Sequence, residues 1–314
     1  MNGLSFVHVS VLLEETVDLM APRDGGRYVD CTLGGGGHAQ RMLERSAPSG
    51  RLLGLDQDEA ALGAAAARLA SFGDRVVLMR ENFRRVARCV AEAGFHPVDG
   101  IVFDLGVSSP QFDVGERGFS YRHDAPLDMR MDRRQVRTAA DVVNEASEEE
   151  LSRIFWEYGE EKFSRRIARE IVRRRAVEGI TTTGQLADLI RDAIPAPARR
   201  TGPHPARRVF QALRIAVNDE LGALEEGLEG AFSVLAPGGR LAVITFHSLE
   251  DRIVKRRFAA WCQGCVCPPD FPVCTCGRTA QARLVTKRAV TPSARETEAN
   301  PRARSAKLRV LERL

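Results

Sequence analysis

The chain has 314 residues, of which 44% are hydrophobic and 28% are charged, and its formal net charge at pH 7 is +4. This composition is ordinary for a globular protein and excludes a disordered or collagen-like chain. No stretch of about 18 residues is both apolar and uncharged, so no membrane helix is expected. Residues 1–19 lack the features of a secretory signal, and we expect the protein to be cytoplasmic.

The first hundred residues alternate short apolar runs with helical stretches. Strands are expected over 27–31, 51–55, 76–79 and 99–105, and helices over 38–46, 59–69 and 84–93. Strands that are apolar on both faces and separated by helices indicate a parallel sheet with helices on each side. The expected fold class is therefore α/β, with a Rossmann-like sheet.

The alternation of strands and helices stops near residue 107. A loop-like segment follows, and further helices are expected from 147 onward and over 163–177, 184–193 and 207–229. A strand is expected again over 240–246, then a helix over 249–261 and short strands at 283–286 and 307–311. We expect a discontinuous α/β domain, residues 1–112 and 215–314, interrupted by an all-helical insertion, residues 113–214.

Basic residues are concentrated in three segments. Between Lys162 and Arg175 seven residues are basic and one is acidic, residues 199–214 contain five arginines and no acid, and residues 284–314 are basic overall. Such clusters in a nearly neutral protein indicate a polyanionic partner such as a nucleic acid. A solvated, arginine-rich helix face would give the same pattern.

A glycine-rich turn follows the first expected strand. Residues 30–38 (DCTLGGGGH) lead from that strand into a helix, and Asp56 and Asp104 end the second and fourth strands. The backbone of such a turn binds nucleotide cofactors, and an acid after the second strand accepts hydrogen bonds from a ribose diol. S-adenosylmethionine and NAD(P) both fit. We favour S-adenosylmethionine, because Asp30 would repel a pyrophosphate and attract a sulfonium; a tight turn without a ligand is the third alternative.

Five of the seven cysteines lie between Cys262 and Cys276. A tight cluster in a chain without a secretory signal indicates a metal site rather than a disulfide framework. Four thiolates bind zinc tetrahedrally, and the expected ligands of a structural zinc ion are Cys265, Cys267, Cys274 and Cys276. Unliganded, reduced thiols are the alternative.

Several longer motifs occur together in one order. They are residues 8–15 (HVSVLLEE), 30–38 (DCTLGGGGH), 104–111 (DLGVSSPQ), 117–120 (RGFS), 126–131 (PLDMRM), 246–252 (FHSLEDR) and 300–305 (NPRARS). In these motifs the chain resembles the bacterial small-subunit ribosomal RNA cytosine-N4 methyltransferase family, also called MraW. The resemblance extends from about residue 8 to residue 314.

The resemblance implies methyl transfer from S-adenosylmethionine to the exocyclic N4 of a cytidine in the decoding region of 16S ribosomal RNA. It also implies a class I methyltransferase sheet with an inserted helical domain for substrate recognition. By motif match, the implied cofactor-binding residues are Gly36, Gly37, His38, Asp56, Phe83, Asp104 and Gln111.

Asp104 and His247 are the candidate catalytic residues. Cytosine N4 is a weak nucleophile because its lone pair is conjugated with the ring, so acceptors for its hydrogens would assist attack. Asp104 is not followed by the Pro-Pro-aromatic sequence of many exocyclic-amine methyltransferases. It is therefore assigned to the cofactor, the substrate or both. His247 is either a substrate-side hydrogen-bonding group or proton acceptor, or a histidine at a helix start with Ser248 as the cap.

A ribosomal base must leave its stack before its amine can react. Residues 117–130 are expected to form the base pocket. Phe119 and Tyr121 there either stack on the base or belong to the core of the insertion. Arg302, Arg304 and the basic segment 162–175 are expected to contact phosphates.

Two other functions remain open at this point. An NAD(P)-dependent oxidoreductase would use the same glycine-rich turn. A non-catalytic RNA-binding factor in ribosome assembly would use the basic insertion without transferring a methyl group.

Overall fold

The structure is a computed structural model that describes residues 10–107, 112, 114–200, 204–268 and 273–314. It divides into two compact units, the first formed by Met1–Gly106 with Gly222–Leu314 and the second by Val107–Leu221. The second unit begins before and ends after the range 113–214 expected for the insertion. No described helix is long and apolar enough to cross a membrane.

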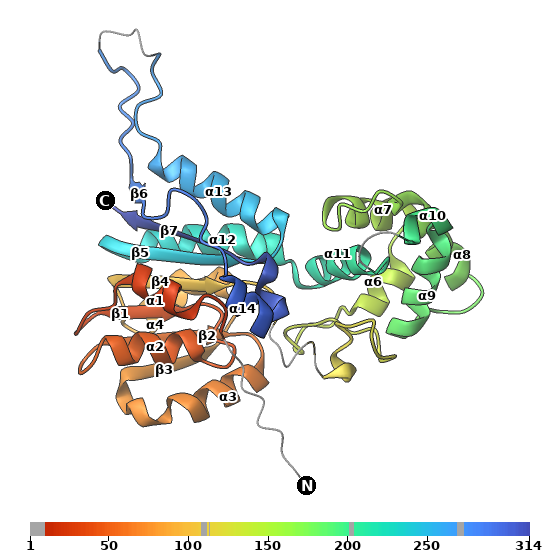
Figure 1. Cartoon of the computed structure of the whole chain (residues 1–314), viewed down its shortest axis with the longest axis horizontal. Coiled ribbons are helices and arrows are strands. Elements are labelled where there is room, and N and C mark those ends of the chain that lie inside the picture. The colour runs from red at the N-terminus through yellow and green to blue at the C-terminus, as the bar shows by residue number, and fades with distance from the viewer. Residues whose placement is uncertain (1–9, 108–111, 113, 201–203, 269–272) are drawn as a thin grey trace. The chain divides into compact units, whose positions relative to one another are not determined.

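One seven-stranded sheet organises the first unit (Figure 1). The strand order is β3-β2-β1-β4-β5-β7-β6. The first five strands in this order, β3, β2, β1, β4 and β5, are parallel, and β7 runs antiparallel to both of its neighbours. The strands are β1 Arg27–Asp30, β2 Arg51–Asp56, β3 Val76–Arg80, β4 Val98–Asp104, β5 Leu235–Thr245, β6 Ala282–Leu284 and β7 Lys307–Arg313. A strand lies at each expected place, but β5 begins at Leu235, five residues before the expected start at 240, and β6 ends at Leu284, two residues before the expected end at 286. The α/β fold class is confirmed.

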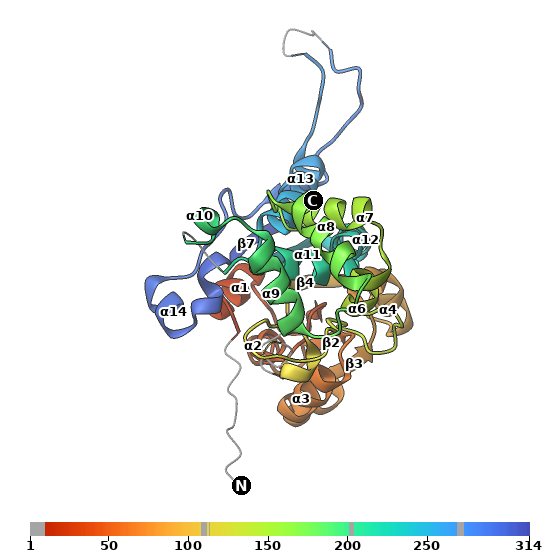
Figure 2. The same ribbon diagram turned by 90° about the vertical axis from the view of Figure 1, so that its right-hand side faces the viewer.

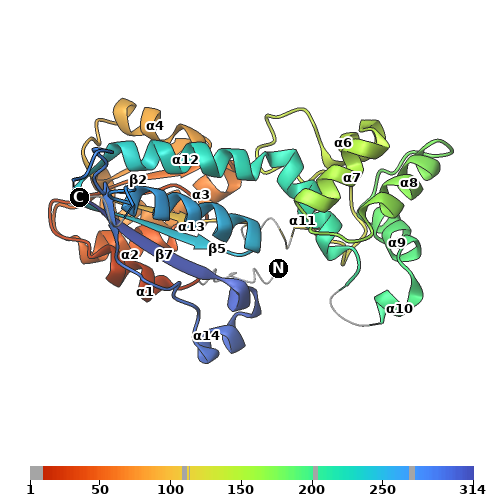
Figure 3. The same cartoon turned by 90° about the horizontal axis from the view of Figure 1, so that it is seen from above.

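Helices cover both faces of this sheet (Figure 3). Along β5, Leu241 and Val243 belong to one buried cluster and Ala242 and Ile244 to another, as the period of two residues in a strand requires. The first cluster packs on α4 Val86–Glu92, α12 Glu220–Val234 and α13 Ser248–Cys262. The second packs on α1 Leu13–Met20, α2 Gly37–Arg45 and α3 Glu59–Leu69. Shorter helices in this unit are η1 Ala70–Arg75, η2 Phe83–Arg85, α14 Ala294–Ala299 and η4 Pro301–Ser305.

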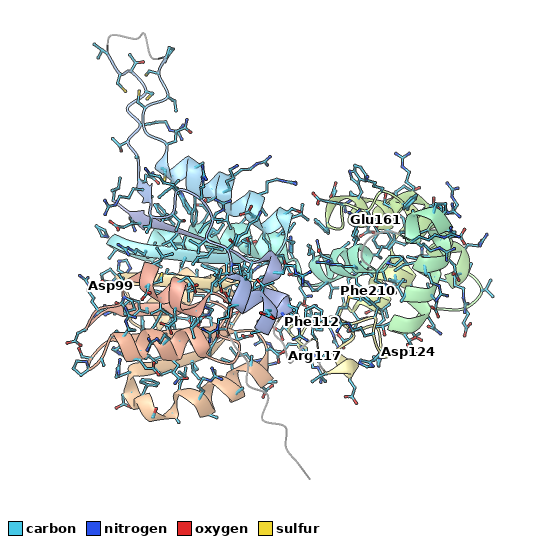
Figure 4. The ribbon with its side chains drawn as sticks, in the orientation of Figure 1. Asp99, Phe112, Arg117, Asp124, Glu161 and Phe210 are labelled. Carbon is cyan, nitrogen blue, oxygen red and sulfur yellow. The ribbon has the colours of Figure 1, made fainter. Side chains whose placement is uncertain are left out.

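The second unit is helical (Figure 2), and a cluster of buried apolar residues forms its own core. Phe155, Ile171 and Phe210 are among the buried residues of that core (Phe210 is labelled in Figure 4). Its helices are η3 Gly115–Arg117, α6 Ala139–Glu145, α7 Glu148–Glu157, α8 Ser164–Arg175, α9 Thr183–Ala193, α10 Ala196–Arg199 and α11 Arg207–Asn218.

The helix expected over 207–229 is in fact two helices. α11 ends at Asn218, Asp219 has a left-handed backbone (φ 47°, ψ 46°), and α12 begins at Glu220. The Asn218 side chain accepts from the Met131 amide and donates to the Met129 carbonyl. The expectation of one helix was wrong. The break lies where Asn218 bonds a loop that is distant in sequence, and the spacing of apolar residues along the helix does not reveal such a contact.

Candidate active site

Acidic side chains end three neighbouring parallel strands of the first unit. Asp30 ends β1, Asp56 ends β2 and Asp104 ends β4. The next strand, β5, pairs Ile244 with Asp104 and is followed by His247 at the start of α13. Because the carboxyl ends of parallel strands meet at one edge of a sheet, where open α/β sheets bind ligands, these four residues form one candidate site.

The glycine-rich turn connects β1 to α2 at the same edge. Gly34 and Gly36 have positive φ values of 49° and 76°, and Gly36 is the N-cap of α2. A Cβ on Gly36 would lie 3.3 Å from the Ala65 Cβ, and one on Gly37 only 2.0 Å from the Ser10 Oγ. The positive φ of Gly36 and the space that Ser10 occupies beside Gly37 favour glycine at these two positions, whether or not a cofactor is bound.

Asp56 ties this turn to the end of β2. Its Oδ2 accepts a hydrogen bond of 2.9 Å from the Gly34 amide, and its Oδ1 accepts one of 2.9 Å from the Asp58 amide. Each carboxylate oxygen has a second lone pair for a further donor. The carboxylate is thus held in one orientation with acceptor capacity remaining.

The pKa values of all three carboxyl groups are raised. Burial is the largest cause in each case: it raises the pKa of Asp30 to about 7 and the pKa of Asp56 to about 6. The pKa of Asp104 is raised well above its ordinary value by burial and by repulsion from Asp30 and Glu250. A cationic ligand at this edge would favour the ionised forms, and an anionic ligand would oppose them.

His38 connects Asp104 with the N-terminal segment. The His38 ring is buried, with Nε2 3.1 Å from the Val11 carbonyl oxygen and Nδ1 3.7 Å from Asp104 Oδ2. The carbonyl only accepts, so Nε2 carries a proton. The Asp104 backbone amide donates to Thr32 Oγ1 at 2.6 Å. His38 and Thr32 thus position Asp104, and Thr32 is a site residue that the sequence did not single out.

His247 is itself the N-cap of α13, in place of Ser248. Its Nδ1 accepts from the Glu250 amide at 3.4 Å, and Glu250 Oε2 accepts from the amides of Phe246 and His247. Because Nδ1 is an acceptor, the neutral ring carries its proton on Nε2. This favours a donor at Nε2 over the proton acceptor considered from the sequence. Glu250, buried beneath the ring, is a second residue that the sequence did not single out.

Two polar side-chain atoms at this edge are buried. Within the described ranges, Asp104 Oδ1 and His247 Nε2 have no hydrogen-bond partner. The Nε2 atom lies 3.0 Å from Glu250 Oε1, yet the direction of approach does not make a hydrogen bond. Burying such atoms costs free energy unless a ligand supplies the missing hydrogen bonds. The site therefore presents one unused acceptor and one unused donor.

Of the two remaining cofactor candidates, Phe83 and Gln111, the structure describes only Phe83. Phe83 is half-buried and packs edge-on against Phe103, with ring centroids 5.5 Å apart. Gln111 lies outside the described residues.

The cysteines expected to bind zinc lie together. The Sγ atoms of Cys265, Cys267, Cys274 and Cys276 are all within 4.8 Å of one another.

In the second unit, the residues expected to hold the base have partners of their own. Arg117 is buried and donates to the carbonyls of Arg130 and Met131. Phe119 is buried in the core, and the Tyr121 ring stacks on His204 with centroids 4.4 Å apart. These contacts agree with the core alternative for both aromatic residues.

The sheet order and the acidic edge define a Rossmann-like α/β protein with a ligand site at the carboxyl ends of its parallel strands. The model of the MraW methylase family matches residues 5–314. A relative in Symbiobacterium thermophilum named "Ribosomal RNA small subunit methyltransferase H" is 62% identical over 311 residues, 99% of this chain and 98% of that protein. One of the same name in Brevibacillus brevis is 57% identical over 314 residues, 100% of each chain. The chain belongs to the MraW methylase family and is a methyltransferase enzyme.

Proposed function

We propose that the chain transfers a methyl group from S-adenosylmethionine to the exocyclic N4 of a cytidine in the decoding region of small-subunit ribosomal RNA. One observation carries the proposal: Asp104 Oδ1 and His247 Nε2 are a buried acceptor and a buried donor without hydrogen-bond partners in the described part of the chain. A cytosine offers the complementary pair, N4–H donors and the N3 and O2 acceptors. The relatives' name supports RNA as the substrate.

The residues at the sheet edge fit the cofactor. When bound, S-adenosylmethionine supplies an electrophilic methyl group on a positively charged sulfur. The ionised forms of these carboxyl groups attract such a cation, and the bound cation in turn lowers their raised pKa values. The pyrophosphate of NAD(P) would meet the same carboxylates with repulsion, and nothing in the relatives supports an oxidoreductase. The residues that we assign to the cofactor are Gly36, Gly37, His38, Asp56, Phe83, Asp104 and Gln111, with Asp56 on the ribose and Phe83 on the adenine.

Asp104 and His247 act on the cytosine in this proposal. Asp104 Oδ1 accepts one N4–H, which directs the nitrogen lone pair toward the methyl group and stabilises positive charge as the new bond forms. Because burial raises its pKa, the Asp104 carboxylate is a stronger base than an exposed aspartate and is suited to take the proton that N4 releases. The His247 Nε2–H donates a hydrogen bond to an acceptor on the Watson–Crick edge of the cytosine, N3 or O2, and so fixes the orientation of the base.

Exposed arginines on α8 and η4 are the candidate contacts for the RNA backbone. On α8, Arg165 and Arg166 are exposed, as are Arg302 and Arg304 on η4 of the first unit. We assign these arginines to phosphate contacts, which make RNA affinity depend on salt, and the helical unit to substrate recognition. An enzyme that modifies ribosomal RNA acts where ribosomes are assembled, so we place it in the cytoplasm.

Labelled methyl transfer tests the proposal. Small subunits from a strain that lacks the gene are incubated with the protein and methyl-labelled S-adenosylmethionine, in parallel with naked 16S RNA. After digestion, the label is expected in N4-methylcytidine from the decoding region. Label elsewhere, or none in cytosine from either substrate, would reject the proposal; binding without transfer would favour the assembly-factor alternative.

The electrostatics predict a pH dependence of cofactor affinity. S-adenosylhomocysteine is the matched control ligand, because it lacks only the methyl group and the sulfonium charge. Below about pH 6 the carboxyls of Asp30 and Asp56 are protonated, and above about pH 7 they are ionised. The cation gains affinity from the ionised forms. The ratio of the two dissociation constants is therefore expected to shift toward S-adenosylmethionine by roughly tenfold between pH 5 and pH 8.

Isothermal titration at several pH values measures this ratio. His38, His247 and Glu250 also face this edge, and their contribution to binding of the shared adenosine and amino-acid parts cancels in the ratio. Asp104 faces the sulfonium in this proposal, and its ionisation adds to the same shift. A ratio that does not change with pH would contradict a sulfonium beside these carboxylates.

A further inference from the structure

The described residues between α13 and β6, 263–268 and 273–281, project from the sheet as two extended arms (Figure 1). They have no apolar core: none of the described residues from Gln263 to Gln281 is buried, and Val266 and Val273 are 44% and 69% exposed. A segment of this length without a core needs a disulfide or a metal ion to hold one shape. The four clustered cysteines are its only concentration of ligating groups among those residues.

The distances between the sulfur atoms fit a tetrahedral ion. Cys265 Sγ is 3.4 Å from Cys274 Sγ and 3.7 Å from Cys276 Sγ, and the Sγ atoms of Cys274 and Cys276 are 3.6 Å apart. Four thiolates about 2.3 Å from a central zinc ion would lie about 3.8 Å from one another. A disulfide needs about 2.05 Å. The sulfurs are thus at the spacing of ligands around one ion rather than of bonded pairs.

Backbone amides surround the sulfurs in a repeated pattern. Each arm of the loop carries a Cys-x-Cys pair, and the amide of the middle residue donates to the second cysteine of the opposite pair. The Val266 amide lies 3.5 Å from Cys276 Sγ, and the Thr275 amide lies 3.4 Å from Cys267 Sγ. N–H donors to sulfur stabilise thiolates and fix their orientation. The backbone is therefore already arranged to support four negatively charged sulfurs.

We propose that Cys265, Cys267, Cys274 and Cys276 bind one Zn²⁺ ion, which holds the loop between α13 and β6 in its shape. Each thiol releases its proton to solvent as it becomes a ligand. Four protein sulfurs leave no open position for water or substrate, so the ion is structural and not catalytic. The proposal concerns this loop alone and stands independently of the methyl-transfer proposal.

Metal analysis of untagged, reduced protein tests the proposal. The wild type is expected to retain about one zinc ion per chain after dialysis. Cys276→Ser is expected to lose it, and Cys262→Ser, at a nearby cysteine outside the cluster, is the matched control that keeps it. Replacement by cobalt(II) is expected to give the visible absorption of a tetrahedral thiolate site in the wild type and in Cys262→Ser only.

Limited proteolysis provides a second readout that does not depend on metal content. Because the loop contributes nothing to the buried clusters, Cys276→Ser is expected to unfold at the wild-type temperature while trypsin cleaves it faster after Arg278. Three results would overturn the proposal: reduced wild type that fails to retain added zinc, Cys276→Ser that retains a full equivalent, or iron in place of zinc in protein from cells.

Discussion

Asp104→Ala is expected to lower kcat for methyl transfer by about 10²- to 10³-fold, the loss typical of removing one group that stabilises charge in a transition state. The physical reason is that Asp104 Oδ1, buried and without a hydrogen bond among the described residues, is the acceptor available to the reacting amine. Single-turnover methyl transfer at saturating cofactor measures this effect without a contribution from product release.

Asp104→Asn is the matched variant. Its amide oxygen still accepts from N4–H but is a far weaker base, so it is expected to retain more activity than alanine and to lose the pH dependence of kcat. Neither variant is expected to be less stable than the wild type without ligand, because burial raises the pKa of Asp104 and its ionised form therefore costs folding free energy at neutral pH. Normal turnover in Asp104→Ala would remove the residue from the mechanism.

Asp56→Ala is expected to weaken the binding of S-adenosylmethionine and of S-adenosylhomocysteine by a similar factor, about 10- to 100-fold. Hydrogen bonds to a charged group contribute about 1.5–3 kcal/mol, and both ligands share the ribose. Titration calorimetry at pH 8, where Asp56 is ionised, measures both affinities.

Asp56 also bonds the Gly34 and Asp58 amides, so a loosened turn must be distinguished from a lost ligand contact. Asp58→Ala is the control for this, since it removes the N-cap of α3 at the same turn without removing the proposed ribose contact. Wild-type affinity in Asp56→Ala, or an equal loss in both variants, would refute the ribose assignment.

The parallel strands and the acids that end them were predictable because the physical signals are local. Apolar runs such as 99–105 are buried on both faces, and a strand end fixes where Asp56 and Asp104 must lie. The topology of an open α/β sheet then brings such ends to one edge. The proximity of the four cysteines was likewise predictable from their short separation along the sequence.

Other features depend on contacts distant in sequence and were not predictable. The break between α11 and α12 depends on Asn218 binding a loop near Met131. Glu250 was recognisable only as part of a motif, since its bonds to the His247 segment require the turn into α13. Gly37 has the conformation of any helix residue, and its need for a glycine comes from Ser10 across the site.

A crystal structure of the protein with bound S-adenosylmethionine would show directly whether the cofactor lies at the carboxyl ends of the parallel strands. We expect the ribose on Asp56, the methionine part along the turn after β1, and the sulfonium facing Asp104, with its methyl group directed at the space beside His247 Nε2. A donor bound elsewhere, or an edge closed by side chains when the donor is saturating, would contradict this expectation.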